Sequence, residues 1–145
     1  MGYPGIFPTG TTVYNKDKAW NGYTVFPTKK GALLIDMNGN EVKLWAGLEG
    51  FPNKILPGGY VLGSTGSIKS KYSYQDEKDL VQVDWNGNIV WKFDKTELYA
   101  DPGQEPQYFA RQHHDYQREG STVGYYYPGG EPKTDSGNTL IPVSY

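Results

Sequence analysis

A ten-residue pattern occurs twice in this chain, and it constrains the fold more than any other feature of the sequence. Each copy is an apolar run, an aspartate, an Asn-Gly pair and a second apolar run, and the copies span residues 33–42 and 81–90. Apolar runs on either side of Asn-Gly predict a β-hairpin with positive φ in its tight turn. Because an internal repeat indicates that one structural unit recurs along the chain, we expect blades or stacked sheets.

The repeated unit is longer than the hairpin, because a glycine followed by an apolar run precedes each copy and occurs again at residues 137–141. The middle unit is interpreted as four strands, near residues 54–56, 60–63, 79–84 and 89–93. The first unit contains similar segments, near residues 11–14, 23–26, 32–36 and 42–45. Four short strands joined in this way make one blade of a β-propeller.

The third unit is shorter, with strands expected near residues 112–118 and 139–143 and no Asp-x-Asn-Gly-Asn turn. The sequence therefore predicts an all-β fold of four-stranded antiparallel blades, about two and a half in number, at about residues 11–45, 52–94 and 110–145. An open ring leaves apolar blade faces bare. We expect either that the chain is the N-terminal part of a longer protein or that copies of it associate.

Two polar segments, residues 65–78 and 119–136, do not fit the repeat and are predicted to be insertions between strands. The second contains three consecutive tyrosines, Tyr125, Tyr126 and Tyr127. Loops on rigid scaffolds often carry binding surfaces, so this loop is a candidate lid or aromatic platform. The alternative is that the tyrosines pack the loop onto the edge of a sheet.

Charge and composition narrow the classes of partner. The 145 residues carry a formal net charge of −2 with both signs interspersed, a pattern that does not indicate binding to nucleic acid or to an anionic membrane. The chain has no cysteine, which excludes disulfides and thiol catalysis. No apolar stretch is long enough to cross a membrane, and the first residues lack the basic and apolar regions of a signal peptide.

The two histidines of the chain, His113 and His114, stand side by side next to Asp115, with Arg111 and Arg118 on either side. Histidine supplies a proton carrier or nucleophile near neutral pH, aspartate can orient its ring, and arginine can bind an anionic group. Successive residues of a strand point to opposite faces, so both rings are not expected to bind one metal ion. The segment is a candidate catalytic site, or a strand that His and Asp fix by hydrogen bonds.

Other motifs have structural explanations. The two Asp-x-Asn-Gly-Asn segments resemble the start of an EF-hand loop, but their glycine is fourth rather than sixth and no acidic residue stands twelfth. We therefore interpret them as hairpin turns and predict no metal. The tryptophans near strand ends are expected to pack between blades, with a quinone-type cofactor stacked on one of them as the alternative. We predict no cofactor.

Six segments, in order along the chain, resemble the N-terminal portion of the bacterial aryl-sulfate sulfotransferases, or arylsulfotransferases. They are residues 8–14, 19–24, 34–40, 51–59, 79–85 and 111–118. The resemblance implies a six-bladed β-propeller, periplasmic or extracellular, that transfers a sulfuryl group from a phenolic sulfate ester to a phenol through a transient sulfohistidine. Its partners would be these small molecules and either the remaining blades or further copies of the chain.

The resemblance places the His-Asp element of the family on His114 and Asp115, with His113 as its neighbour, and makes these the expected catalytic residues. Arg118, Arg111 and Tyr126 are the expected substrate-binding residues. The nucleophilic histidine of the family lies in later blades, so we expect this chain alone to be inactive. The alternative function is that of a self-assembling structural or ligand-binding propeller fragment without catalysis.

Overall fold

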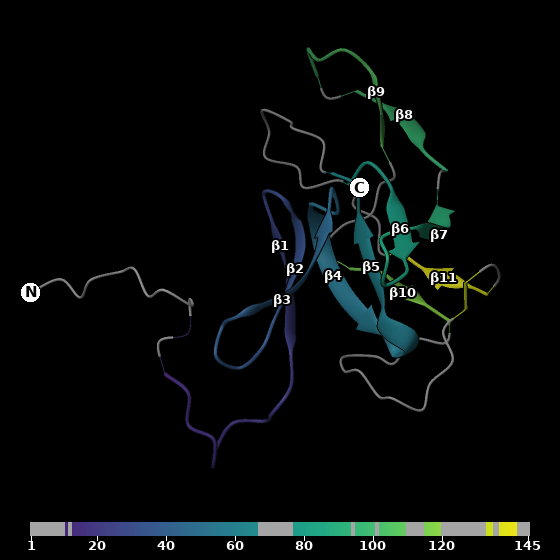
Figure 1. Ribbon diagram of the computed structural model, residues 1–145. Coiled ribbons are helices and arrows are strands. Elements are labelled where there is room, and N and C mark those ends of the chain that lie inside the picture. The colour runs from purple at the N-terminus through teal and green to yellow at the C-terminus, as the bar shows by residue number, and fades with distance from the viewer. Residues whose placement is uncertain are drawn as a thin grey trace, which may run out of the picture.

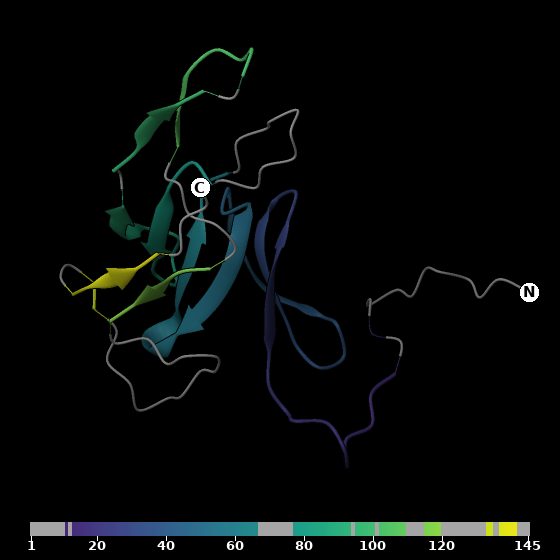
Figure 2. The ribbon, with the colours of Figure 1, turned by 180° about the vertical axis from the view of Figure 1, so that it is seen from behind.

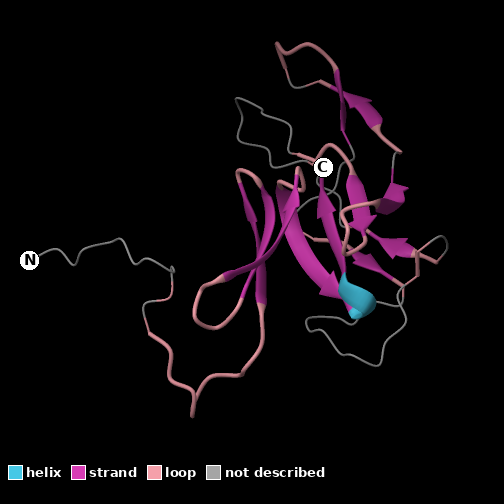
Figure 3. Cartoon of the chain, viewed as in Figure 1, coloured by secondary structure: helices cyan, strands magenta, loops and turns pink. Residues whose placement is uncertain are grey.

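The structure is a computed structural model that describes residues 11, 13–66, 77–93, 95–100, 102–109, 115–119, 133–134 and 137–141. This part of the chain is all-β and forms antiparallel sheets (Figures 1 and 3). Its one helical element is η1 (Pro57–Gly59), a single 3-10 turn. No helix in the described ranges is therefore long and apolar enough to cross a membrane.

The central element is a four-stranded antiparallel sheet whose strands follow one another in chain order. They are β4 (Gly50–Leu56), β5 (Tyr60–Ser64), β6 (Leu80–Val83) and β7 (Ile89–Phe93). These strands confirm the four that were predicted for the middle unit, within a few residues at each end. Each strand carries apolar residues toward both faces of the sheet, as expected of a sheet that is covered on both sides.

A three-stranded antiparallel sheet precedes it, in the order β1 (Thr24–Thr28), β2 (Gly31–Ile35) and β3 (Glu41–Ala46). The strand predicted near residues 11–14 is wrong for the described residues of that range, since 11, 13 and 14 belong to no strand. Val13 is 84% exposed, so its side chain has no core to join at this position. A short apolar pattern does not form a strand without a surface on which to bury it.

The two predicted hairpins are confirmed, and their turns have equivalent hydrogen bonds. In the β2–β3 turn, Asp36 N donates to Asn40 O at 3.0 Å, and in the β6–β7 turn Asp84 N donates to Asn88 O at 2.9 Å. Gly39 and Gly87 hold φ at 83° and 92°, as a three-residue loop with a left-handed last residue requires. A register shift follows at the same place in each copy, after Leu34 and after Gln82.

The two sheets lie against each other, and the four-stranded sheet is covered on both faces (Figures 1 and 2). On one face Val61, Val81 and Val83 form a buried cluster with residues of the three-stranded sheet, namely Ala32, Leu34 and Trp45. On the other face Leu56, Leu62 and Leu80 pack against Tyr116. Double coverage explains why every residue of β6 is buried.

Two short hairpins complete the described structure. The first joins β8 (Glu97–Tyr99) to β9 (Gln107–Phe109) and was not predicted. The second pairs β10 (Gln117–Arg118) with β11 (Thr139–Leu140). These strands lie within the last two predicted ranges, and each is shorter than expected. Both hairpins lie on the side of the four-stranded sheet away from β1–β3 (Figure 2).

Candidate functional site

The candidate site divides between described and undescribed parts of the chain. Asp115 and Arg118 lie within the described residues, whereas His113, His114, Arg111 and Tyr126 lie outside them. The geometry of the site can therefore be built from residues 115–119 and from the sheet on which they rest.

Asp115, one residue after His114, forms an ion pair with a lysine of the four-stranded sheet. Its carboxylate lies 2.5 Å from Nζ of Lys54 in β4 and is 59% exposed. The same ammonium group donates to the backbone oxygen of Tyr116 at 2.8 Å and to the side-chain oxygen of Gln117 at 3.4 Å. One lysine thus fastens residues 115–117 to β4.

Tyr116 anchors the same peptide inside the fold. Its side chain is 1% exposed, and its hydroxyl donates to the backbone oxygen of Gly63 at 2.9 Å. Burial raises the pKa of the Tyr116 phenol well above its ordinary value, and the nearby carboxylates of Asp79 and Glu77 raise it further. The phenol is therefore a neutral hydrogen-bond donor that positions its neighbours.

Arg118 is buried as well, at 1% exposed. Its guanidinium donates to Gln82 Oε1, Thr139 Oγ1 and Lys133 O, each at 3.1 Å. It also lies 3.8 Å from the ring centre of Trp91. Burial lowers the pKa of Arg118 from its ordinary value. In this arrangement Arg118 ties β10 to β6, β7 and β11, and its predicted role in substrate binding stays a prediction.

A polar cluster around Asp79, between the end of β5 and the start of β6, was not identified from the sequence. Asp79 is 5% exposed, accepts from Thr65 N at 2.8 Å and from Thr65 Oγ1 at 2.7 Å, and pairs with Lys92 at 3.0 Å. Burial acts to raise the pKa of Asp79, but these hydrogen bonds and the Lys92 charge outweigh it and hold the pKa below its usual value. The cluster links the end of β5 to the start of β6 rather than forming an open site.

The aspartates of the two hairpin turns are engaged in the turns themselves. Asp36 accepts from the side chain of Asn40 at 2.9 Å, and Asp84 accepts from that of Asn88 at 2.8 Å. These bonds hold the pKa of both carboxyls below their ordinary value. Within the described ranges, no three His, Cys, Asp or Glu side chains gather closely enough to bind a metal ion.

The residues near the histidines thus form a fixed support. Lys54, Tyr116 and Arg118 secure the chain from residue 115 to residue 118 on one face of the four-stranded sheet. Sequence reasoning identified Asp115 and Arg118 but missed Lys54 and Tyr116, because their partners are more than 50 residues away along the chain. Comparison with protein-family models, curated proteins and solved structures gives no match for this chain.

Proposed function

We propose that this chain is part of an arylsulfotransferase-like β-propeller and that His114 and Asp115 belong to its sulfuryl-transfer site. The substrates would be a phenolic sulfate ester as donor and a phenol as acceptor. Arylsulfotransferase resemblance in six ordered segments supports the assignment from the sequence side. The assignment is tested by measuring how substitution of the histidines changes the binding of a sulfate ester.

The observation that carries the proposal is the anchoring of Asp115. A residue that contributes to catalysis must stand on a support that fixes its position, because small misplacements cost large factors in rate. The peptide bonded directly to His114 meets this requirement, with Lys54 holding Asp115 at 2.5 Å and the Tyr116 side chain buried beneath it. The carboxylate of Asp115 is still 59% exposed, and we propose that it orients a histidine ring or accepts its proton.

The proposed chemistry is transfer of a sulfuryl group in two steps. A neutral imidazole nitrogen attacks sulfur, the bond from sulfur to the phenolic oxygen breaks, and the phenolate leaves with the electron pair. A second phenol, after losing its proton, then attacks sulfur and releases the imidazole. In both steps the negative charge on the sulfuryl oxygens needs cationic and hydrogen-bond partners. His114 would bind these oxygens or carry the proton, and the nucleophile would be a histidine outside this sequence.

The arrangement of the sheets supports the propeller part of the proposal. Two antiparallel sheets lie face to face, and their equivalent hairpins share the same turn bonds and the same register shift. A propeller is built from such sheets, each packed against the next. We accordingly propose that β4–β7 are one blade, that β1–β3 belong to the preceding blade and that β10–β11 begin the following one.

The test is calorimetric titration of the chain with 4-nitrophenyl sulfate, together with absorbance of released 4-nitrophenol. We expect wild type to bind the ester without sustained release, and His114→Gln to bind about tenfold or more weakly, because a charge-assisted contact is lost. His113→Gln serves as the matched control and should change binding less. Equal affinity of wild type and His114→Gln would remove the support for this site. Sustained release by the chain alone would contradict the proposal that the nucleophilic histidine lies outside this sequence.

Self-association is the second candidate function, and one surface favours it. The face of the three-stranded sheet turned away from β4–β7 carries Phe26, Leu33 and Leu44, which oppose one another in the strand register and are each partly exposed. Apolar sheet faces of this kind are usually covered by a further layer. Light scattering tests the idea: a concentration-dependent rise in mass supports it, and a monomer at all concentrations contradicts it.

A further inference from the structure

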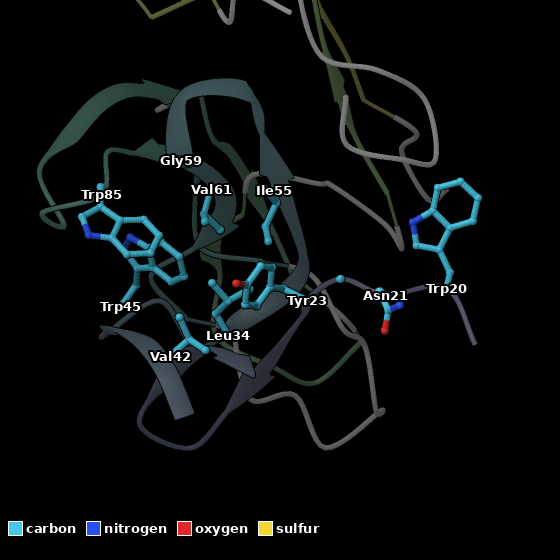
Figure 4. A pocket seen from close by; sticks show the side chains of 11 residues that line it. Trp20, Asn21, Tyr23, Leu34, Val42, Trp45, Ile55, Gly59, Val61 and Trp85 are labelled. Carbon is cyan, nitrogen blue, oxygen red and sulfur yellow. The ribbon is translucent and has the colours of Figure 1, made fainter. Parts of the chain in front are cut away.

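A cavity of about 1010 Å³ opens between the two sheets, on the side where their Asp-x-Asn-Gly-Asn turns lie. The three-stranded sheet contributes Leu34, Val42 and Trp45, and the four-stranded sheet contributes Ile55 and Val61. Figure 4 shows these side chains turned toward one space, with Trp85 and Tyr23 at its border and Trp20 set apart on the segment that leads to β1. The walls therefore converge from two elements instead of forming a flat face.

The aromatic wall of the cavity is fixed in place. Trp45 and Trp85 meet edge to face, with ring centroids 5.5 Å apart and planes at 87°. Trp45 is 3% exposed, and its indole nitrogen donates to the backbone oxygen of Asp84 at 2.9 Å. Trp85, by contrast, is 44% exposed and leaves part of its ring open to solvent. Such a pair offers a rigid ring surface at little cost in side-chain entropy.

The described lining has no lysine, arginine, histidine, aspartate or glutamate that could pair with a charged ligand. Apart from the phenol of Tyr23, none of the lining side chains is ionisable. The other polar side-chain groups are the amide of Asn21 and the indole N–H groups of Trp20 and Trp85, because the N–H of Trp45 already donates to Asp84 O. Nζ of Lys43 lies 5.6 Å from the Trp85 ring centre, but Lys43 is not part of the lining. A charged ligand would lose its hydration here without gaining an ion pair with a lining side chain, whereas a neutral ring has little hydration to lose.

We propose that this cavity is a binding site for a small, neutral, planar aromatic molecule. Its volume is at the upper end of the range for small-molecule sites, and an apolar lining with few polar groups is what such sites share. The cavity involves none of the residues near the histidines, so this proposal is independent of the proposed sulfuryl transfer. A concave space between two sheets suits a compact ligand better than the flat face of a second copy.

The probe is coumarin, a neutral two-ring molecule, compared with coumarin-3-carboxylate, which has the same rings and a negative charge. Titration is followed by the indole N–H signals of the chain in proton–nitrogen NMR spectra, assigned with single Trp→Phe variants. We expect saturable shifts at Trp45 and Trp85 with no shift at Trp91, which lies on the other face of the four-stranded sheet. The carboxylate should bind about tenfold or more weakly.

Two substitutions provide the matched comparison. Val42 is 43% exposed in the cavity wall, and Leu98 is 58% exposed in β8, so Val42→Asp and Leu98→Asp place the same charge inside and outside the cavity. Val42→Asp should weaken coumarin binding about tenfold or more, whereas Leu98→Asp should leave it unchanged. The NMR spectrum of each variant reports whether it is folded, and Trp85→Ala replaces Val42→Asp if the latter is not.

Three results would overturn the proposal. One is the absence of saturable shifts at Trp45 and Trp85, and another is equal binding of coumarin and its carboxylate. The third is a dimer that Val42→Asp dissociates and that does not bind coumarin, because a second copy of the chain would then occupy the cavity.

Discussion

Replacing the buried Tyr116 by phenylalanine tests how the chain that follows the histidine pair is anchored to the four-stranded sheet. The change removes one hydroxyl and keeps the ring that packs on Leu62 and Leu80, so the lost quantity is the hydrogen bond to Gly63 O at 2.9 Å. A buried bond of this kind contributes about 1 kcal/mol. For a chain of this size that corresponds to a fall in Tm of about 2–5 °C at pH 7.

The same substitution has a pH dependence whose sign follows from the pKa of the phenol. Because burial raises the pKa of Tyr116 in the folded protein, the unfolded chain loses this proton first as the pH increases. Stability from the buried phenol is therefore complete below pH 10 and declines above it. By pH 11 the decline is about 1.4 kcal/mol, which erases the advantage of wild type over Tyr116→Phe.

The assay is urea unfolding at pH 7 and at pH 11, followed by tryptophan fluorescence. Tyr108→Phe is the matched control, because Tyr108 is 65% exposed in β9 and should change stability by less than about 0.5 kcal/mol at either pH. If wild type keeps its full advantage over Tyr116→Phe at pH 11, the phenol is not buried as described. Equal stability at pH 7 would mean that the bond to Gly63 contributes nothing.

Three further predictions concern the same framework. Arg118→Lys should lower the free energy of unfolding in urea by about 2–4 kcal/mol. The reason is that a lysine ammonium cannot replace the three hydrogen bonds of the guanidinium or its stacking on Trp91. A variant that stays stable and only loses binding of the sulfate ester would contradict this. Lys54→Met should cost about 1–2 kcal/mol and broaden the histidine ring signals in NMR spectra, and unchanged signals would refute the anchoring of Asp115. Asp84→Asn should be less stable than wild type at pH 7, and this difference should vanish as the pH falls below 3.8, since the pKa of Asp84 is lowered in the folded state; a difference that persists at low pH would contradict that origin.

The sequence predicted the parts of the fold that depend on local pattern. The Asp-x-Asn-Gly-Asn turns depend on local contacts, since Asp84 bonds to Asn88 four residues later. Such a turn can therefore be predicted from its own residues. The strands of the four-stranded sheet were predicted because β5 and β6 are buried on both faces and have nearly continuous apolar runs. The β8–β9 hairpin was missed because its strands are only three residues long and Leu98 and Tyr108 are exposed.

The candidate site was predicted only in part, for a physical reason. The His-His-Asp motif shows chemistry in its residue types, but the partner of Asp115 is Lys54, and nothing in a lysine of a strand indicates which distant carboxylate it will meet. Arg118 illustrates the same limit: an arginine beside histidines suggests anion binding, whereas here it is buried and bonded to Gln82 and Thr139. Long-range partners follow from packing, which a single sequence does not specify.

The central claim is that His114 contacts the sulfuryl group of an aryl sulfate. The direct test is a titration of the chain with 4-nitrophenyl sulfate, followed by the ring signals of His113 and His114 in NMR spectra, with 4-nitrophenol as the matched ligand without the sulfuryl group. We predict a saturable shift of the His114 ring with the sulfate ester and little or none with the phenol. An unmoved His114 signal at saturating ester, or the same shift with 4-nitrophenol, would contradict the claim.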